Sequence, residues 1–109
     1  MKRLPTPSQN VCGKYVRNAR NNYGKRHHTK MTQADLAAKL QLKGMDYFDR
    51  LAVCRIENGT RKVSDIELKY LAAALEVSVV YLLYGPVNQI PDFDALEALV
   101  AEGDEFPNI

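Results

Sequence analysis

The sequence has no long apolar run and no apolar leader. None of its segments approaches the roughly 20 apolar residues that a membrane-spanning helix requires. The first seven residues, MKRLPTP, hold two basic residues and two prolines and lack the apolar stretch of a signal peptide. We therefore expect a cytoplasmic protein that does not span a membrane.

Cysteine is scarce, and clusters that carry catalytic or metal chemistry are missing. Cys12 and Cys54 are the two cysteines, and their helical positions favour free thiols in a reducing compartment, although a disulfide between them stays open. The two histidines, His27 and His28, are neighbours with no cysteine pair nearby, which makes a weak metal site. No glycine-rich phosphate loop or paired-cysteine set occurs. We expect neither an enzyme nor a bound cofactor or metal, and no small-molecule effector is evident.

Acidic residues are rare in the first half of the chain and basic residues are rare in the second. Residues 1–62 hold 14 Lys/Arg and 4 Asp/Glu, a balance of +10, whereas residues 63–109 hold 1 Lys and 9 Asp/Glu, a balance of −8. A basic surface suits the phosphate backbone of a nucleic acid, because each neutralised phosphate releases counterions. A merely solvated basic surface is the alternative. The acidic half is expected to point away from any bound polyanion.

Hydrophobic periodicity predicts an all-α fold with five helices and a further short helix near the C-terminus. The expected helices cover residues 11–22, 33–41, 50–58, 64–75, 77–83 and 93–102. Three units follow from this pattern: a flexible basic arm at 1–10, a helical domain at 11–85, and an acidic C-terminal helix and tail at 86–109. Residues 1–10 contain two prolines and no apolar period.

Capping residues mark the expected helix starts. A hydroxyl or carboxylate precedes each start after the first, so that it accepts a hydrogen bond from a free backbone amide. The expected caps are Thr32, Asp49, Ser64, Ser78 and Asp92. Glu67 completes a capping box with Ser64. Glycines mark the expected helix ends at Gly24, Gly59 and Gly85.

The order of three segments carries a family resemblance. Residues 32–40 read TQADLAAKL, residues 53–59 read VCRIENG, and SDIE at 64–67 leads into LAAALEVS at 71–78. Over about residues 11–85, this order resembles the DNA-binding domain of the phage repressor and Cro family. The resemblance implies a helix-turn-helix, double-stranded DNA as partner, and a transcriptional regulator that acts as a repressor.

The resemblance also implies which residues read bases. In a helix-turn-helix the second helix lies in the major groove, and here that is the helix at 50–58. Its outer face holds Arg50, Leu51 and Arg55. An arginine bonds guanine O6 and N7 in a bidentate pair, while a leucine meets only a thymine methyl. The alternative is that both arginines only solvate the surface or contact phosphates.

Other residues are expected to position the domain without reading sequence. The family's glutamine at the start of the second helix, here Gln33, implies a phosphate contact that also braces the reading helix. The expected backbone contacts are Gln33, Lys43, Asn58, Thr60, Arg61 and Lys62. Arg20 and Glu57 match a family pair that ties the first helix to the third, so we expect a structural ion pair.

The chain departs from the family pattern in two connections and in its reading helix. The links at residues 24–31 and 42–48 each exceed the usual length by about six residues. The first is basic and is either close to DNA or simply solvated. The second is too apolar for a free loop and is expected to pack on the core through Leu42, Met45, Tyr47 and Phe48. The apolar Leu51 keeps open a different function, an antitoxin-like or interaction module that binds a partner protein.

Apolar residues near the C-terminus predict a homodimer. A single reading helix contacts too few base pairs to select a site, and the family dimerises on two-fold operators. The expected interface within residues 78–100 consists of Val79, Val80, Tyr81, Phe93, Leu96, Leu99 and Val100. The alternative is that the last helix folds back and completes the core of its own subunit.

Overall fold

The fold is all-α, as the sequence predicts. The computed structural model describes residues 8–87 and 89–96, and these residues form no strand. The labelled helices are α1 (Gly13–Arg26), α2 (Gln33–Gln41), α3 (Arg50–Glu57), α4 (Asp65–Leu75) and α5 (Val79–Tyr84). Residues 93–96 are helical too, at the predicted start of the last helix, and the rest of that predicted helix lies outside the described residues. In the described part of the chain, no helix is long and apolar enough to cross a bilayer.

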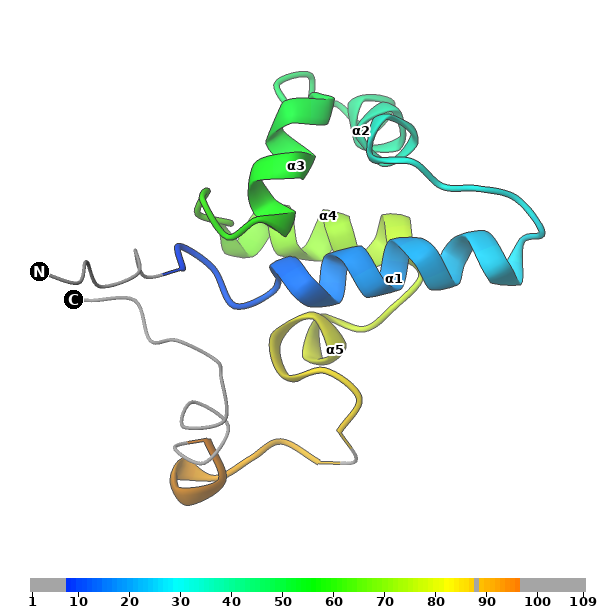
Figure 1. Cartoon of the computed structure of the whole chain (residues 1–109). Helices are drawn as coiled ribbons and strands as arrows, with labels where there is room; N and C mark the ends of the chain where they lie inside the picture. Colours follow the sequence, from blue (N-terminus) through cyan, green and yellow to red (C-terminus); the bar gives the residue numbers. More distant parts are fainter. Residues whose placement is uncertain (1–7, 88, 97–109) are drawn as a thin grey trace, which may run out of the picture.

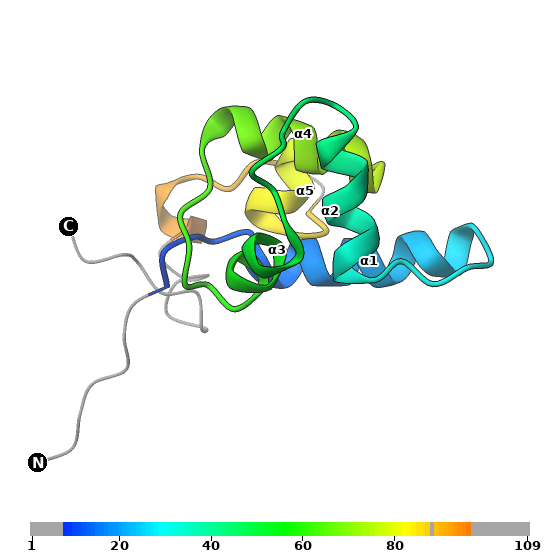
Figure 2. The same ribbon diagram turned by 90° about the horizontal axis from the view of Figure 1, so that it is seen from above.

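Helix α1 is the element around which the others are arranged. It packs against α3, α4 and α5, while α2 packs against α3 and α4. Figure 1 shows α2 and α3 on one side of α1 and α5 on the other side. Figure 2, seen from above, shows α2 running from the level of α1 toward α4. The N-terminus of α2 therefore lies beside α1 and the C-terminal end of α3.

One apolar core joins all five helices. Each of the five helices α1 to α5 contributes apolar side chains to it, and burial of these side chains is the main force that holds the short helices together. The apolar residues with 0–1% exposure are Val16, Ala19, Leu36, Leu40, Phe48, Val53, Ile56, Leu71, Leu75 and Leu82. Both cysteines are free thiols. Burial raises the pKa of Cys12 to about 11, so this thiol is not ionised at neutral pH.

The predicted caps are confirmed. The side chains of Thr32, Ser64 and Ser78 accept hydrogen bonds from the amides three residues ahead, at 3.0–3.1 Å. Asp49 accepts from the Ala52 amide at 2.8 Å, and Asp92 accepts from the Ala95 amide at 2.9 Å. Thr32 and Ser64 both belong to complete capping boxes. Local sequence therefore sets where these helices begin.

The predicted end of the first helix is wrong. Helix α1 continues through Gly24 to Arg26. The Thr29 amide donates to the Gly24 carbonyl at 2.9 Å, which folds the following loop back onto the helix. A Cβ at Gly24 would lie 2.6 Å from the Thr29 carbonyl oxygen. This glycine allows the loop to approach closely and does not end the helix.

Replacing Gly24 by alanine is expected to destabilise the fold. Alanine normally stabilises a helix interior relative to glycine by about 0.5–1 kcal/mol. Here the clash with Thr29 is expected to reverse the sign and cost roughly 1–2 kcal/mol in urea unfolding. The matched control is Asn22→Ala, at an exposed position of the same helix. Stabilisation by both substitutions would contradict the close approach.

The connection between α2 and α3 packs on the core through only half of its apolar residues. Met45 and Phe48 are buried as predicted, but Leu42 is 85% exposed and Tyr47 60% exposed, so the prediction was wrong for these two. Gln41 anchors the connection, since its side-chain amide donates to the Phe48 carbonyl at 2.8 Å. The connection therefore leaves two apolar side chains, Leu42 and Tyr47, exposed on the surface.

The C-terminal ends of α1 and α4 are fastened together by polar contacts. Arg26 donates to the Leu75 carbonyl at 3.1 Å, and His27 lies 3.0 Å from the Glu76 carboxylate. Glu76 ends α4 in the left-handed conformation with φ 60°. Lys39 of α2 donates to the Ala74 carbonyl at 2.8 Å. These contacts satisfy carbonyls that the end of α4 leaves without helical partners.

Residues 8–10, expected within a flexible arm, are held against the end of α3 and the turn that follows it. The Gln9 amide donates to the Gly59 carbonyl at 2.7 Å. The Asn10 side chain donates to the carbonyls of Ile56 and Arg61, at 3.1 and 2.8 Å. Its side-chain oxygen accepts from the amide of Gly13, the first residue of α1, at 2.8 Å. Residues 8–10 therefore belong to the helical domain, and residues 1–7 lie outside the described part of the chain.

Candidate nucleic-acid interface

Helix α3 has one buried face and one exposed face. Val53 and Ile56 point into the core, while Arg50, Leu51 and Arg55 are exposed, Leu51 by 45%. Within the described residues, the guanidinium groups of Arg50 and Arg55 make no hydrogen bond or ion pair. The exposed face of α3 thus presents two guanidinium groups without a partner among the described residues and one apolar side chain.

The Glu57 carboxylate is the centre of a buried polar network that holds α3. Its side chain is 0% exposed. Arg20 of α1 donates to both of its oxygens, at 2.8 and 3.0 Å, and Gln33 of α2 donates at 3.1 Å. Arg17, which is half exposed, adds a bond of 3.3 Å. The network joins three helices, so the position of α3 is fixed by side chains from α1 and α2.

The predicted ion pair between Arg20 and Glu57 is therefore present. Arg20 also donates to the Met31 carbonyl at 2.9 Å, just before α2 begins. Gln33 braces α3 as the resemblance implied, through its bond to Glu57. Its phosphate contact stays a prediction. The contact of Arg17 with Glu57 was not predicted. Arg17 lies one helical turn before Arg20, and this spacing could have indicated that both arginines reach Glu57.

The residues predicted to contact the DNA backbone lie mainly in the turn after α3. Gly59 has a φ of 76°, as expected for a glycine that closes a helix. Thr60 and Lys62 are exposed, and the Asn58 side-chain oxygen accepts from Arg17 at 3.2 Å. Lys43 is also exposed, in the connection after α2.

Arg61 forms an ion pair that was not predicted. It was expected at a DNA backbone, but it forms a bidentate pair with Glu67 at 3.1 and 2.9 Å. It also donates to the Lys62 carbonyl at 2.9 Å and lies 5.0 Å from the Phe48 ring centre. Arg61 thus fastens the turn to the start of α4 and covers the buried phenylalanine.

Acid is expected to destabilise the protein through Glu57 and Glu67. Burial acts to raise the pKa of Glu57, but hydrogen bonds from Arg20, Gln33 and Arg17 outweigh it and lower that pKa. The hydrogen bond from Arg61 is the main cause that lowers the pKa of Glu67. Lowered pKa values mean that the unfolded state takes up protons first. The stabilisation is complete above the unfolded pKa, about 4.3, and is lost as pH falls through the folded pKa.

Urea unfolding at a series of pH values measures this effect. The free energy of unfolding should change little from roughly pH 7 to 5 and fall below about pH 4.3. The fall should be shallower in Glu67→Gln, because this variant has lost one of the two groups. A fall of equal steepness in the variant would contradict the assignment of Glu67.

The α5 part of the expected dimer interface is divided between core and surface. Val79 and Tyr81 are partly buried and pack against the core of their own chain, and the Tyr81 ring lies edge-on to Tyr15 at 5.8 Å. Val80 is 37% exposed. Of these three residues, Val80 offers the most accessible surface.

The C-terminal part of the expected interface is described only as far as residue 96. Phe93 is 85% exposed and Leu96 is half-buried. Leu99 and Val100 lie outside the described residues. The alternative was that the last helix folds back and completes the core of its own subunit. Phe93, being exposed, does not do so.

The described residues offer little to a metal ion. Among residues 8–87 and 89–96, no group of three or more His, Cys, Asp or Glu side chains lies close enough together to hold one.

Comparison of the chain with protein-family models, curated proteins and solved structures found no match.

Proposed function

We propose that this protein binds double-stranded DNA in a sequence-specific way, with α2 and α3 forming a helix-turn-helix and α3 lying in the major groove. The observation that carries the proposal is the pair of unpartnered guanidinium groups, Arg50 and Arg55, on the exposed face of a braced helix. An arginine with no intramolecular partner keeps all its donors for guanine O6 and N7. The Glu57 network supports precise readout because it fixes α3 before DNA arrives.

Charge supports the same orientation. Exposed or half-buried polar residues at the start of α2, in the α2–α3 connection and in the turn after α3 suit phosphate contacts: Gln33, Lys43, Asn58, Thr60 and Lys62. The basic half of the chain, residues 1–62, contributes all of them, while residues 63–109 carry the excess acidic charge. The acidic half would then lie distal to DNA, where it does not repel phosphates.

The proposal includes a regulatory role, that of a repressor. A domain that covers an operator blocks transcription without a catalytic step. Binding is tested by titrating labelled duplexes with protein at increasing salt. The affinity should fall steeply and log-linearly with salt concentration. A protein that does not bind DNA even at low salt would contradict the proposal.

A symmetric homodimer through residues 78–100 is part of the proposal. The full-length chain is expected to scatter light as a dimer at micromolar concentration in the presence of DNA. Val80→Asp should shift it toward monomer, because a charge buried in an apolar interface lacks a partner. Ile66→Asp is the matched control, since Ile66 is 62% exposed on α4, outside the proposed interface. A monomer at all concentrations, with and without DNA, would contradict dimerisation.

A second candidate function is a module that binds a partner protein. The exposed apolar side chains of Leu42, Tyr47 and Leu51 favour it, because they lie on the α2–α3 connection and on α3 itself. An apolar contact survives high salt, whereas a phosphate contact does not. A partner that stays bound through high salt and is lost in Leu42→Ser would favour this candidate over DNA.

A further inference from the structure

Two arginines of α1 share one carboxylate. Arg20 donates to both oxygens of Glu57, at 2.8 and 3.0 Å, and Arg17 donates to one of them at 3.3 Å. In the described part of the chain, neither arginine forms an ion pair with a second carboxylate. One negative charge therefore faces two positive charges, and the network keeps a surplus of one positive charge.

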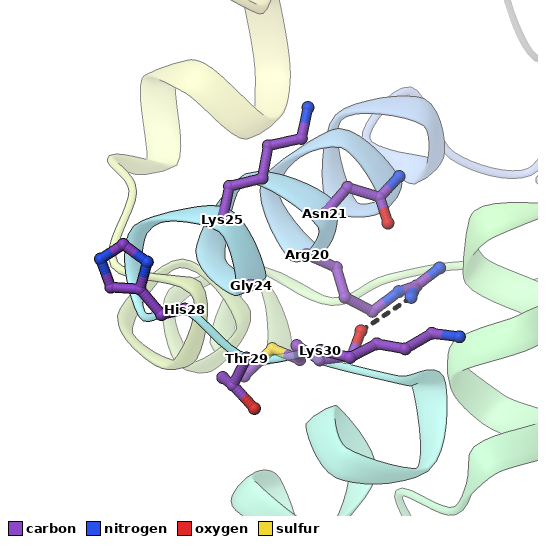
Figure 3. A pocket seen from close by; sticks show the side chains of 8 residues that line it. Arg20, Asn21, Gly24, Lys25, His28, Thr29 and Lys30 are labelled. Carbon is purple, nitrogen blue, oxygen red and sulfur yellow. Dashed lines mark hydrogen bonds between the residues drawn. The ribbon is translucent and has the colours of Figure 1, made fainter.

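The surplus charge is accessible at Arg17 and not at Arg20. The Arg20 side chain is mostly buried, and it also donates to the Met31 carbonyl at 2.9 Å, which is the dashed bond in Figure 3. Arg17 is half exposed. Two of its five N–H groups donate within the described residues, to Glu57 and to the Asn58 side-chain oxygen. Its other N–H groups can therefore donate to a ligand that arrives from solvent.

Arg17 lies where polar side chains from three parts of the fold meet. Its Nε and the side-chain nitrogen of Gln33 both donate to Oε1 of Glu57, at 3.3 and 3.1 Å. Its Nη2 lies 3.2 Å from the side-chain oxygen of Asn58. Gln33 is the first residue of α2, and Asn58 directly follows α3. The cation from α1 is therefore held between two residues that suit contacts with the DNA backbone.

We propose that Arg17 binds a phosphate of the DNA backbone beside Gln33 and Asn58, which makes α1 part of the DNA-binding surface. The inference rests on the proposed function. A guanidinium suits this ligand because its planar fork matches phosphate oxygens and its charge persists at all physiological pH values. Glu57 holds the fork in place before DNA arrives, and it does not cancel the charge of Arg17 because Arg20 already neutralises it. The alternative is that Arg17 only stabilises the network.

DNA binding by the full-length protein against salt separates the two roles. Arg17→Gln should weaken binding roughly tenfold at low salt, for every sequence alike, and reduce the slope of log affinity against log salt by about 0.9. Arg17→Lys keeps the charge and should keep the slope. Arg26→Gln is the matched control, because the side chains of Arg17 and Arg26 are 49% and 48% exposed on the same helix, but Arg26 pairs with its own carboxylate, Glu76, at 3.8 Å. An unchanged slope in Arg17→Gln, or an equal reduction in Arg26→Gln, would overturn the inference.

A measurement without DNA separates failure of this inference from failure of the proposed function. Titration with inorganic pyrophosphate should shift the side-chain amide signals of Gln33 and Asn58 saturably in two-dimensional NMR. The shifts should be lost in Arg17→Gln, whose spectrum should otherwise stay as dispersed as that of the parent, and kept in Arg26→Gln. If the parent binds no DNA, the proposed function fails, while pyrophosphate shifts that require Arg17 would still support a phosphate ligand there. Absence of both DNA binding and pyrophosphate shifts would overturn both.

Discussion

Replacement of Glu57 by alanine is expected to lower the free energy of unfolding by about 3–5 kcal/mol, without DNA present. The substitution removes the shared acceptor of Arg20, Gln33 and Arg17. Arg20, whose side chain is only 14% exposed, then keeps its charge in a site that excludes most water. A domain of this size has a total stability of roughly 5–15 kcal/mol, so the loss should be visible in both urea and thermal unfolding.

Two control variants separate the buried charge from simple loss of a contact. Arg17→Gln removes the half-exposed partner, and it should cost at most about 1 kcal/mol because exposed ion pairs contribute little. Glu57→Gln keeps an acceptor oxygen and should lie between the other two variants. A Glu57→Ala protein with the same melting curve as the parent would show that the network does not stabilise the fold.

Replacement of Arg55 by alanine is expected to weaken specific DNA binding by about 1–3 kcal/mol and to relax the preference at one base pair. Arg55 is exposed on α3, and its guanidinium has no partner among the described residues. Its removal should therefore leave stability within about 0.5 kcal/mol of the parent. The measurement is competition binding against operators with each base substituted in turn.

Lys62→Ala is the matched control for Arg55. Lys62 is exposed beyond the end of α3, in the turn before α4. A phosphate contact at this position should weaken binding to every sequence alike and reduce the salt slope by about 0.9. Equal losses for Arg55→Ala on all sequences would show that Arg55 contacts phosphate and not a base.

Short-range signals made the helix starts predictable. A cap and the amide that it accepts are three residues apart, so Thr32 and Ser64 reveal their roles within a few letters of sequence. The core stripes were predictable for the same reason, because their spacing repeats along one helix. The Arg20–Glu57 pair, 37 residues apart, was expected only because of the family resemblance.

Long-range contacts explain the errors. Gly24 resembled a helix end, but its lack of a side chain serves the loop backbone at Thr29. The Glu67 carboxylate accepts from both the Ser64 amide and Arg61, and its role in the capping box concealed the second partner. Asn10 lay in a segment without apolar periodicity, yet it bonds carbonyls up to 51 residues away. A single sequence gives no local sign of such partners.

The proposed function requires that α3 reads base sequence in DNA. Selection of bound duplexes from a random pool by the full-length protein measures this readout. We expect enrichment of a two-fold motif that contains guanines, with half-sites about one helical turn apart. Sequences selected by the Arg55→Ala variant should show no base preference at one position of each half-site. A pool that remains random after repeated rounds, although the protein binds DNA at low salt, would contradict base readout by α3.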